Sequence, residues 1–292
     1  MKNLLQKNIP KEVFWGVIAA FFYVLSMLTA FEIGRISINK IPHHPREVVN
    51  KPPIRVPLFV PPSKVRHRRR FVFSFDDPLV LQPLRKRERL DFILKGAGDD
   101  LEVFQRLMKW VRAQWSPSRP DPYPPINALI ILDKIRKGET GGFCAQYCFV
   151  LCQALQSLGY TARYVTIKGH EVIEVWSAKY NKWIMLDPMY EAFVEKNGIP
   201  LSVIEMHDFL FTAQDLTIHA NRPLPNKKRY LSRFKNFAIW IKNDHVSSPI
   251  NFSDIERYKV YFLNTLEERL YIPPESLFTF FREDLYFNPY EG

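Results

Sequence analysis

The sequence is poor in cysteine, with three among 292 residues, and this scarcity limits the chemistry that sulfur can supply. Cys144, Cys148 and Cys152 lie four residues apart, so on a helix they share one slowly drifting face. Because a continuous helix places their side chains poorly for a bridge, we expect no disulfide framework. The spacing also departs from the zinc and iron–sulfur signatures. We therefore expect no metal and no cofactor, and we expect Cys148 and Cys152 to be buried packing residues.

Charge is absent from one stretch near the start of the sequence. No residue from Val13 to Phe31 is charged, and Phe, Val, Ala and Leu dominate. These nineteen residues, at about 1.5 Å each, just cross a hydrocarbon core of about 30 Å. This predicts a short tail, 1–12, and a transmembrane signal anchor, 13–33. A cleavable signal peptide, which Leu28-Thr29-Ala30 fits only weakly, and a buried helix of a soluble core are the alternatives.

The orientation of this anchor is not decided by charge, because basic residues before and after it nearly balance. Large C-terminal domains translocate largely regardless of charge. We therefore expect a single-pass membrane protein whose main domain lies outside the cytoplasm.

Glycine is absent from Pro42 to Pro62, where seven prolines stand instead. Proline disfavours a helix or a central strand and predicts a semi-rigid spacer, which we place at 34–70. Ten Lys or Arg residues fall between Arg35 and Arg70, and the formal net charge of the chain is +11. A basic segment beside a membrane span suits anionic lipid headgroups or an acidic polymer. Nucleic acid is not expected as a partner, because no recognition motif accompanies the charge.

The remaining residues, 71–292, predict one α+β domain with a core at about 99–190. Alternating phenylalanines from Phe71 to Phe75 indicate a strand at the edge of the domain. Asp99 or Asp100 caps a predicted helix that runs to about Trp115, and a second helix is predicted over Asn127–Lys137.

The C-terminal extension is rich in Phe, Tyr and Leu, and its segment Ser253–Leu270 is typical of an amphipathic helix. We expect a helical extension that packs around the core, with a membrane-binding or partner helix as the alternative.

The run Gly141-Gly142-Phe143-Cys144 opens a largely apolar helical pattern that ends at Gly159. A helix with so few polar residues should be central and buried, with its first turn facing a cleft. There the unpaired N–H groups and the positive end of the helix dipole favour a thiolate at Cys144 and could bind an oxyanion. Alone, Cys144 would be interpreted as another core cysteine.

His170 and Asp187 strengthen the case for Cys144. Strands are predicted on both sides of the polar turn at 178–181, with His170 starting the first and Asp187 ending the second. In an antiparallel pair, opposed residues have a constant sum of numbers and share a face. A sum of 357 or 359 places the two side chains on one face, opposite or one diagonal step apart. Asp187 could then fix one ring nitrogen of His170 and leave the other for Cys144.

The blocks Gly142-Phe143-Cys144-Ala145-Gln146-Tyr147, Leu158-Gly159-Tyr160-Thr161-Ala162-Arg163-Tyr164-Val165, His170 with Glu174-Val175, and Trp183-Ile184-Met185-Leu186-Asp187-Pro188 resemble the transglutaminase-like superfamily of papain-like cysteine enzymes. The resemblance implies a Cys-bearing helix packed on an antiparallel sheet. It also implies Cys144 as nucleophile, His170 as base and acid, and Asp187 as the residue that orients His170. Glu171, after His170, departs from the small or apolar residue common there, and no calcium-binding loop of the EF-hand type is present.

The sequence therefore predicts a membrane-anchored enzyme that acts on amide bonds of protein or peptide substrates through a Cys144 thioester. Hydrolysis is placed slightly ahead of amine transfer, and a non-catalytic adaptor or binding module at the membrane is the alternative. A second oxyanion donor is needed beyond the Cys144 N–H. Gln114, Trp115 and Gln146 are candidates, although surface or packing roles are expected for each. His207, His219 and His245 lack metal-ligand spacing and are expected in surface or satisfied roles.

Overall fold

The computed structural model describes residues 64–65, 70–210, 215–263 and 272–291, all within the unit 51–292. The expected tail 1–12, the anchor 13–33 and nearly all of the linker 34–70 lie outside the described residues. Among the helices that are described, none combines the length and apolar character needed to cross a membrane.

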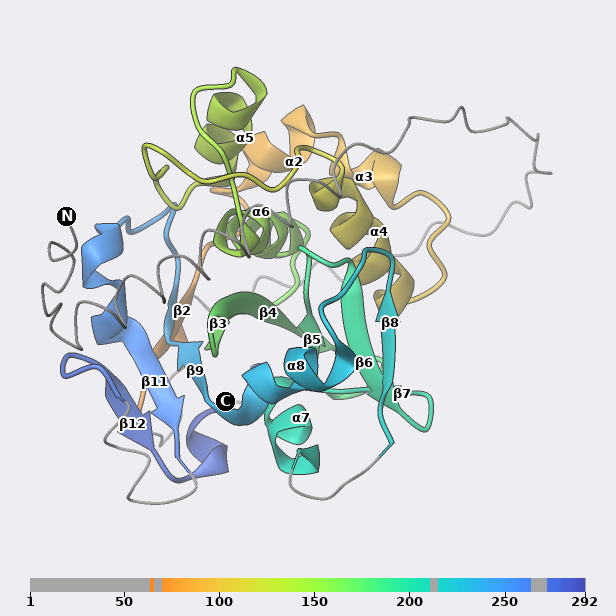
Figure 1. Ribbon diagram of the computed structural model, residues 1–292. Helices are drawn as coiled ribbons and strands as arrows, with labels where there is room; N and C mark the ends of the chain where they lie inside the picture. The colour runs from red at the N-terminus through yellow and green to blue at the C-terminus, as the bar shows by residue number, and fades with distance from the viewer. Residues whose placement is uncertain (1–63, 66–69, 211–214, 264–271, 292) are drawn as a thin grey trace, which may run out of the picture. The chain divides into compact units, whose positions relative to one another are not determined.

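A six-stranded sheet with the order β12-β11-β9-β3-β4-β5 forms the centre of the fold (Figure 1). Its neighbours are antiparallel except β11 and β12, which are parallel. The strands are β3 (Ala162–Ile167), β4 (His170–Ser177), β5 (Lys182–Leu186), β9 (Phe237–Trp240), β11 (Lys259–Phe262) and β12 (Leu277–Thr279).

Two three-stranded sheets accompany it, with the orders β1-β2-β10 and β7-β6-β8. Their strands are β1 (Lys64–Val65), β2 (Phe73–Phe75), β6 (Ala192–Lys196), β7 (Ile199–Pro200), β8 (Thr217–Ala220) and β10 (Lys242–Asn243).

The helices are α2 (Gln82–Arg87), α3 (Leu90–Ile93), α4 (Asp100–Arg112), α5 (Ala128–Arg136), α6 (Cys144–Ser157), α7 (Val203–Phe209) and α8 (Lys227–Leu231). Short 3-10 helices are η1 (Ser232–Lys235), η2 (Phe252–Tyr258) and η4 (Arg282–Asp284). This mixture of helices with mainly antiparallel sheets agrees with the expected α+β class.

Side-chain caps set the starts of the two helices that the sequence predicted. Asp99 accepts a hydrogen bond from the Glu102 N–H at the start of α4, and Asn127 accepts one from the Ile130 N–H at the start of α5. Helix α4 ends at Arg112, about one turn short of the predicted Trp115.

Helix α6 is the most buried helix element of the site region, and it packs on β3 and β4 with α4 and α5 on its outer side (Figure 1). All its residues from Gln146 to Ser157 are buried. Alternate residues of β4 divide between the two faces of the sheet: Ile173 belongs to the core around α6, whereas Val172 packs with residues of α7 and α8 on the other face.

The predicted amphipathic helix over Ser253–Leu270 is wrong. Residues 252–258 form the 3-10 helix η2, and residues 259–262 form strand β11, which pairs with both β9 and β12. Val260 and Phe262 are buried on one face of the sheet at the strand spacing of two. A short apolar segment fits either period, and the β-branched and aromatic side chains here favour the pleated surface. Residues 264–271 lie outside the described residues.

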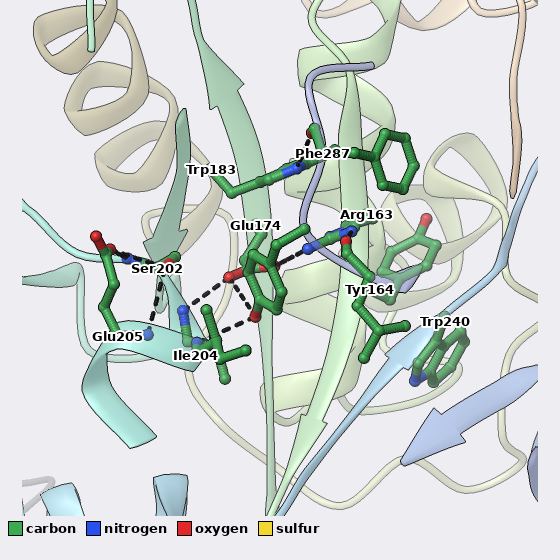
Figure 2. Close-up of polar contacts among 12 residues, drawn as sticks. Arg163, Tyr164, Glu174, Trp183, Ser202, Ile204, Glu205, Trp240 and Phe287 are labelled. Atoms are coloured by element: carbon green, nitrogen blue, oxygen red, sulfur yellow. Dashed lines mark hydrogen bonds and ion pairs between the residues drawn. The ribbon is translucent and has the colours of Figure 1, made fainter. Parts of the chain in front are cut away.

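Part of the C-terminal extension is held to the sheet by a buried ion pair. Arg163 of β3 donates to Glu174 Oε2 of β4 from Nε at 3.0 Å and Nη2 at 2.7 Å, and both side chains are fully buried (Figure 2). Arg163 Nη1 also donates to the Leu285 carbonyl at 2.5 Å, and the Tyr286 hydroxyl donates to Glu174 Oε1 at 3.0 Å. Two polar residues of the sequence blocks quoted above thus bind the last segment of the chain.

Candidate active site

Cys144 is the first residue of α6 and, like Ala145 after it, is partly exposed, whereas the helix is buried from Gln146 onward. Gln146, two residues on, folds its side chain back so that its Oε1 atom accepts a hydrogen bond from the Phe143 N–H at 2.9 Å. The first-turn N–H groups of a helix have no partners within the helix and carry its positive dipole end. The thiol therefore lies where negative charge on sulfur is favoured.

Two glycines allow the chain to approach this helix closely. A Cβ atom on Gly142 would lie 2.7 Å from Trp115 Nε1, and one on Gly141 would overlap the Arg119 backbone. Trp115 Nε1 donates to the Gly142 carbonyl at 3.2 Å, and the Ser118 N–H donates to the same oxygen at 3.1 Å. The glycines thus allow the loop after α4 to pack closely against the residues that precede Cys144.

The hairpin of β4 and β5 has a register that the sequence left open between two values. Every opposed pair sums to 359, from Ile173 with Leu186 to Ser177 with Lys182, and the loop is 178–181. His170 and Asp187 consequently share a face, one diagonal step apart. The even-sum register that would have separated them does not occur.

The two side chains meet in the folded chain. His170 Nε2 lies 2.8 Å from Asp187 Oδ2, and their side chains are 2% and 0% exposed. Asp187 Oδ1 accepts the backbone N–H groups of Met189 and Tyr190 at 3.2 and 3.4 Å. The two main-chain bonds fix the orientation of the carboxylate. Because Asp187 contacts the ring through Nε2, Nδ1 is the ring nitrogen of His170 that Asp187 does not bind.

Cys144 completes this arrangement. Burial alone would lower the pKa of His170, but the charge and hydrogen bond of Asp187 outweigh it. A hydrogen bond and charge interaction with Cys144 act in the same direction, and together these raise the pKa of His170 to about 10. The ring is therefore an imidazolium at neutral pH, held between a thiol and a carboxylate.

Two tyrosines that the sequence did not single out surround the pair. The Tyr230 hydroxyl of α8 donates to Asp187 Oδ2 at 3.0 Å, and Tyr230 is fully buried. The Tyr190 ring packs beside the His170 ring, with centroids 5.5 Å apart, and Tyr230 meets Tyr190 edge to face at 5.9 Å. No local pattern marks Tyr230, because it lies 43 residues beyond Asp187.

A family model matches this part of the chain. The model of the transglutaminase-like superfamily covers residues 88–188, which hold α4, α5, α6 and the β3–β5 strands. Residues 88–188 are therefore similar to the transglutaminase-like superfamily. No curated protein and no solved structure matches the chain. This superfamily generally includes cysteine-dependent enzymes that act on protein substrates, and Cys144, His170 and Asp187 all lie within the matched range.

The two other cysteines of the matched range differ from Cys144. Cys148 and Cys152 are buried, and burial raises the pKa of each thiol well above its ordinary value. Both belong to the apolar core around α6, so the prediction that they are packing residues is confirmed. All three cysteines are free.

The candidates for a second oxyanion donor differ in their contacts. Gln114 donates to the Trp110 carbonyl and accepts from Arg136, and the Trp115 indole N–H is bonded to Gly142. Gln146 differs, because its Nε2 atom is buried and has no hydrogen-bond partner of good geometry among the described residues. Its amide faces the hydroxyl of Tyr123.

Tyr123 lies in the loop between α4 and α5, and its local sequence gave no signal for the site. Burial, the largest effect, raises the pKa of Tyr123, whereas the Gln146 amide opposes the rise and nearby Glu171 and Cys144 add to it. Tyr123 is 39% exposed, and its ring packs against that of Phe252 at a tilt of 36° with centroids 4.3 Å apart. Tyr123 thus brings a hydroxyl close to Cys144 from outside the helix.

Glu171, the departure noted in the sequence, lies beside the site. Thr166 Oγ1 lies 3.0 Å from each of its carboxylate oxygens. Burial raises the pKa of Glu171 to about 7, although Lys259, Thr166 and His170 oppose the rise. This carboxyl therefore titrates near neutral pH beside His170.

The three remaining candidate histidines have other contacts. His207 bonds the Phe234 carbonyl through Nδ1 at 3.2 Å, and His219 pairs with Glu195 at 2.9 Å. His245 is buried against Trp240, and burial lowers its pKa to about 4. Neither of its ring nitrogens has a hydrogen-bond partner of good geometry among the described residues, so the expected surface or satisfied role is wrong for His245. In the described part of the chain, no group of three or more His, Cys, Asp or Glu side chains could hold a metal ion.

A cavity of about 370 Å³ lies away from Cys144, between α4 and the β6–β8 sheet, with Gln105, Lys109 and His219 in its wall. Its lining holds no cysteine, serine or threonine, so we place the chemistry at Cys144.

Proposed function

We propose that this chain is a cysteine-dependent acyl-transfer enzyme that acts on amide bonds of protein or peptide substrates. Cys144 is the nucleophile, His170 is the general acid and base, and Asp187 holds the imidazole. The observation that carries the proposal is the position of the His170 ring, bonded to Asp187 through Nε2 and interacting with the Cys144 thiol.

The first half of the reaction forms a thioester. The Cys144 thiolate attacks the carbonyl carbon of the amide, and the resulting oxyanion lies at the first-turn N–H groups of α6. His170, protonated at neutral pH, gives its Nδ1 proton to the nitrogen of the leaving amine as the C–N bond breaks. The acyl group remains on the Cys144 sulfur.

The second half releases the acyl group. Neutral His170 takes a proton from the acceptor, which attacks the thioester carbon, and Cys144 leaves as a thiolate paired again with the imidazolium. Water as the acceptor gives hydrolysis, and a primary amine gives a new amide. We place hydrolysis slightly ahead, because no acceptor-amine site is recognisable in the sequence.

Capture of the acyl group tests the proposal. The full-length chain is incubated with a denatured protein mixture, quenched in acid, and digested, and the peptide that contains Cys144 is analysed by mass spectrometry. We expect a mass increase on Cys144 that hydroxylamine removes and that is lost in Cys144→Ala and reduced in His170→Ala. Release of free acid, against incorporation of an added biotinylated amine, separates hydrolysis from transfer.

The alternative is a non-catalytic adaptor that uses the cleft or the basic linker for binding at the membrane. It predicts that no acyl adduct forms on Cys144. It also predicts that a thiol reagent labels Cys144, Cys148 and Cys152 equally, and only after the chain has been unfolded. That result would end the enzyme proposal.

We further propose that residues 13–33 anchor the chain as a single-pass membrane protein with the catalytic domain outside the cytoplasm, and that the linker 34–70 contacts anionic lipid or an acidic polymer. The support is the charge-free run and the basic stretch that follows it. Protease protection of the domain in sealed inverted vesicles tests the orientation. Recovery of the full chain in the soluble fraction after alkaline extraction would contradict the anchor.

A further inference from the structure

The carboxylate of Asp187 receives a hydrogen bond from a residue that lies outside the range matched by the family model. Tyr230 belongs to α8, whereas the match ends at residue 188. Its hydroxyl lies 3.0 Å from Asp187 Oδ2, the same oxygen that lies 2.8 Å from His170 Nε2. Two donors therefore converge on one carboxylate oxygen, and the second of them comes from the C-terminal extension.

The proton of Tyr230 stays on its hydroxyl. Burial, followed by the charge of Asp187, raises the pKa of Tyr230 well above its ordinary value. The hydroxyl is consequently a donor throughout the pH range in which a cysteine enzyme works. A hydrogen bond to a charged group is stronger than one between neutral groups, so this contact constrains the carboxylate firmly.

The segment that carries Tyr230 is tied to the strands of the site. The Lys168 N–H, just before His170, donates to the Arg233 carbonyl at 3.0 Å, and the Arg222 N–H donates to the Tyr190 carbonyl at 3.2 Å. These two hydrogen bonds therefore help to hold the Tyr230 hydroxyl in place relative to His170 and Asp187.

We propose that Tyr230 is a positioning residue of the catalytic site: its hydroxyl shares Asp187 Oδ2 with His170 and sets both the direction and the charge of the carboxylate that the imidazolium faces. This inference rests on the proposed function and deepens it, since it assigns part of the site to the C-terminal extension. Asp187 Oδ1 is fixed by main-chain N–H groups, so Tyr230 supplies the remaining constraint on Oδ2.

The sign of the effect follows from competition for one oxygen. A donor on Oδ2 withdraws negative charge from the atom that stabilises the imidazolium. Loss of the Tyr230 hydroxyl should therefore raise the pH at which His170 loses its proton, and a stronger donor should lower it. The other ionisable groups near the ring stay the same in both comparisons. They are Cys144 of α6, Glu171 of β4, Tyr190 after β5, and Arg233 of η1.

The test measures the titration midpoint of His170 directly. Full-length chain labelled with ¹⁵N-histidine is titrated by NMR, with the His170 ring signals assigned by their loss in His170→Ala. In Tyr230→Phe we expect the midpoint to rise by up to about one pH unit. Replacement of Tyr230 by 3-fluorotyrosine, a more acidic phenol of nearly the same shape, should lower the midpoint and keeps the test valid if Tyr230→Phe folds poorly.

Tyr286→Phe is a matched control. Tyr286 also donates a 3.0 Å hydrogen bond to a buried carboxylate, that of Glu174, on the part of the sheet away from His170. It should lower the thermal stability as Tyr230→Phe does, but leave the His170 midpoint unchanged. A purely structural role for Tyr230 would make the two variants behave alike.

The outcomes separate this inference from the proposed function. The rate of Cys144 alkylation by iodoacetamide is measured on the same samples. A fast rate that depends on His170, combined with a midpoint that neither Tyr230 replacement moves, overturns the role of Tyr230 alone. A wild-type rate equal to that of an ordinary thiol overturns the proposed function, and the role of Tyr230 with it.

Discussion

Replacement of Asp187 by Asn removes the negative charge that faces His170 and keeps the size of the side chain. In the wild type the pKa of His170 is about 10, above the ordinary 6.5, even though burial acts to lower it. The difference corresponds to roughly 5 kcal/mol in favour of the imidazolium. Without the carboxylate charge, burial dominates, and the pKa of His170 should fall below 6.5.

The consequence for Cys144 is the loss of its cationic partner near neutral pH. The thiolate is the form that is alkylated, and an adjacent imidazolium favours it, so loss of the imidazolium should slow alkylation at pH 6 by about 100-fold. The assay is the second-order rate of iodoacetamide labelling at Cys144, followed by mass spectrometry of the Cys144 peptide in Asp187→Asn and wild type.

Asp76→Asn is the matched control, because Asp76 is also fully buried and accepts two backbone N–H groups, from Val246 and Ser247. It should change the folding stability but not the labelling rate of Cys144. If Asp187→Asn labels at pH 6 as fast as the wild type, the carboxylate does not hold the imidazolium charge and the reasoning above fails.

The remaining predictions concern stability and the approach to Cys144. Arg163→Met should lower the free energy of unfolding in urea by about 3–5 kcal/mol, because it leaves the buried Glu174 carboxylate without its partner. Adding Glu174→Leu should recover most of this loss. A loss below about 1 kcal/mol for Arg163→Met would contradict the stabilising role of this ion pair. The raised pKa of His170 stabilises the fold fully below about pH 6.5, and this stabilisation is lost as the pH rises to about 10. The difference in melting temperature between wild type and His170→Gln should therefore become smaller between these two pH values. A difference that stays constant would refute this prediction. Gly142→Ala should lower the Cys144 labelling rate at least about tenfold, because the new Cβ would lie 2.7 Å from Trp115 Nε1; an unchanged rate would show that the chain adjusts freely.

Local sequence carried enough information to predict the elements that hold the site. Asp99 and Asn127 cap their helices as side chains of these types do, and the loop at 178–181 has one of the lengths that the sequence allowed, which gives a register with His170 and Asp187 on one face. These features depend on neighbours in sequence, so no tertiary information was needed.

The parts that the sequence did not reveal depend on contacts between distant segments. Tyr230 contacts Asp187 only because the chain after β8 returns to the β4–β5 hairpin. A single tyrosine in a basic segment forms no sequence pattern that would predict this contact. Strand β11 was mistaken for helix because Val260 and Phe262 fit both periods over so few residues, and its pairing with β9 decides the outcome. The partnership of Arg163 with Glu174 likewise emerges only when β3 and β4 pair.

The most direct test of the central claim compares the iodoacetamide labelling rate of Cys144 at pH 6 in wild type and His170→Ala. The account predicts that the wild-type rate exceeds the variant rate by about 100-fold, because only the wild type holds an imidazolium beside the sulfur. Equal rates in the two proteins, with both folded as judged by circular dichroism, would contradict it.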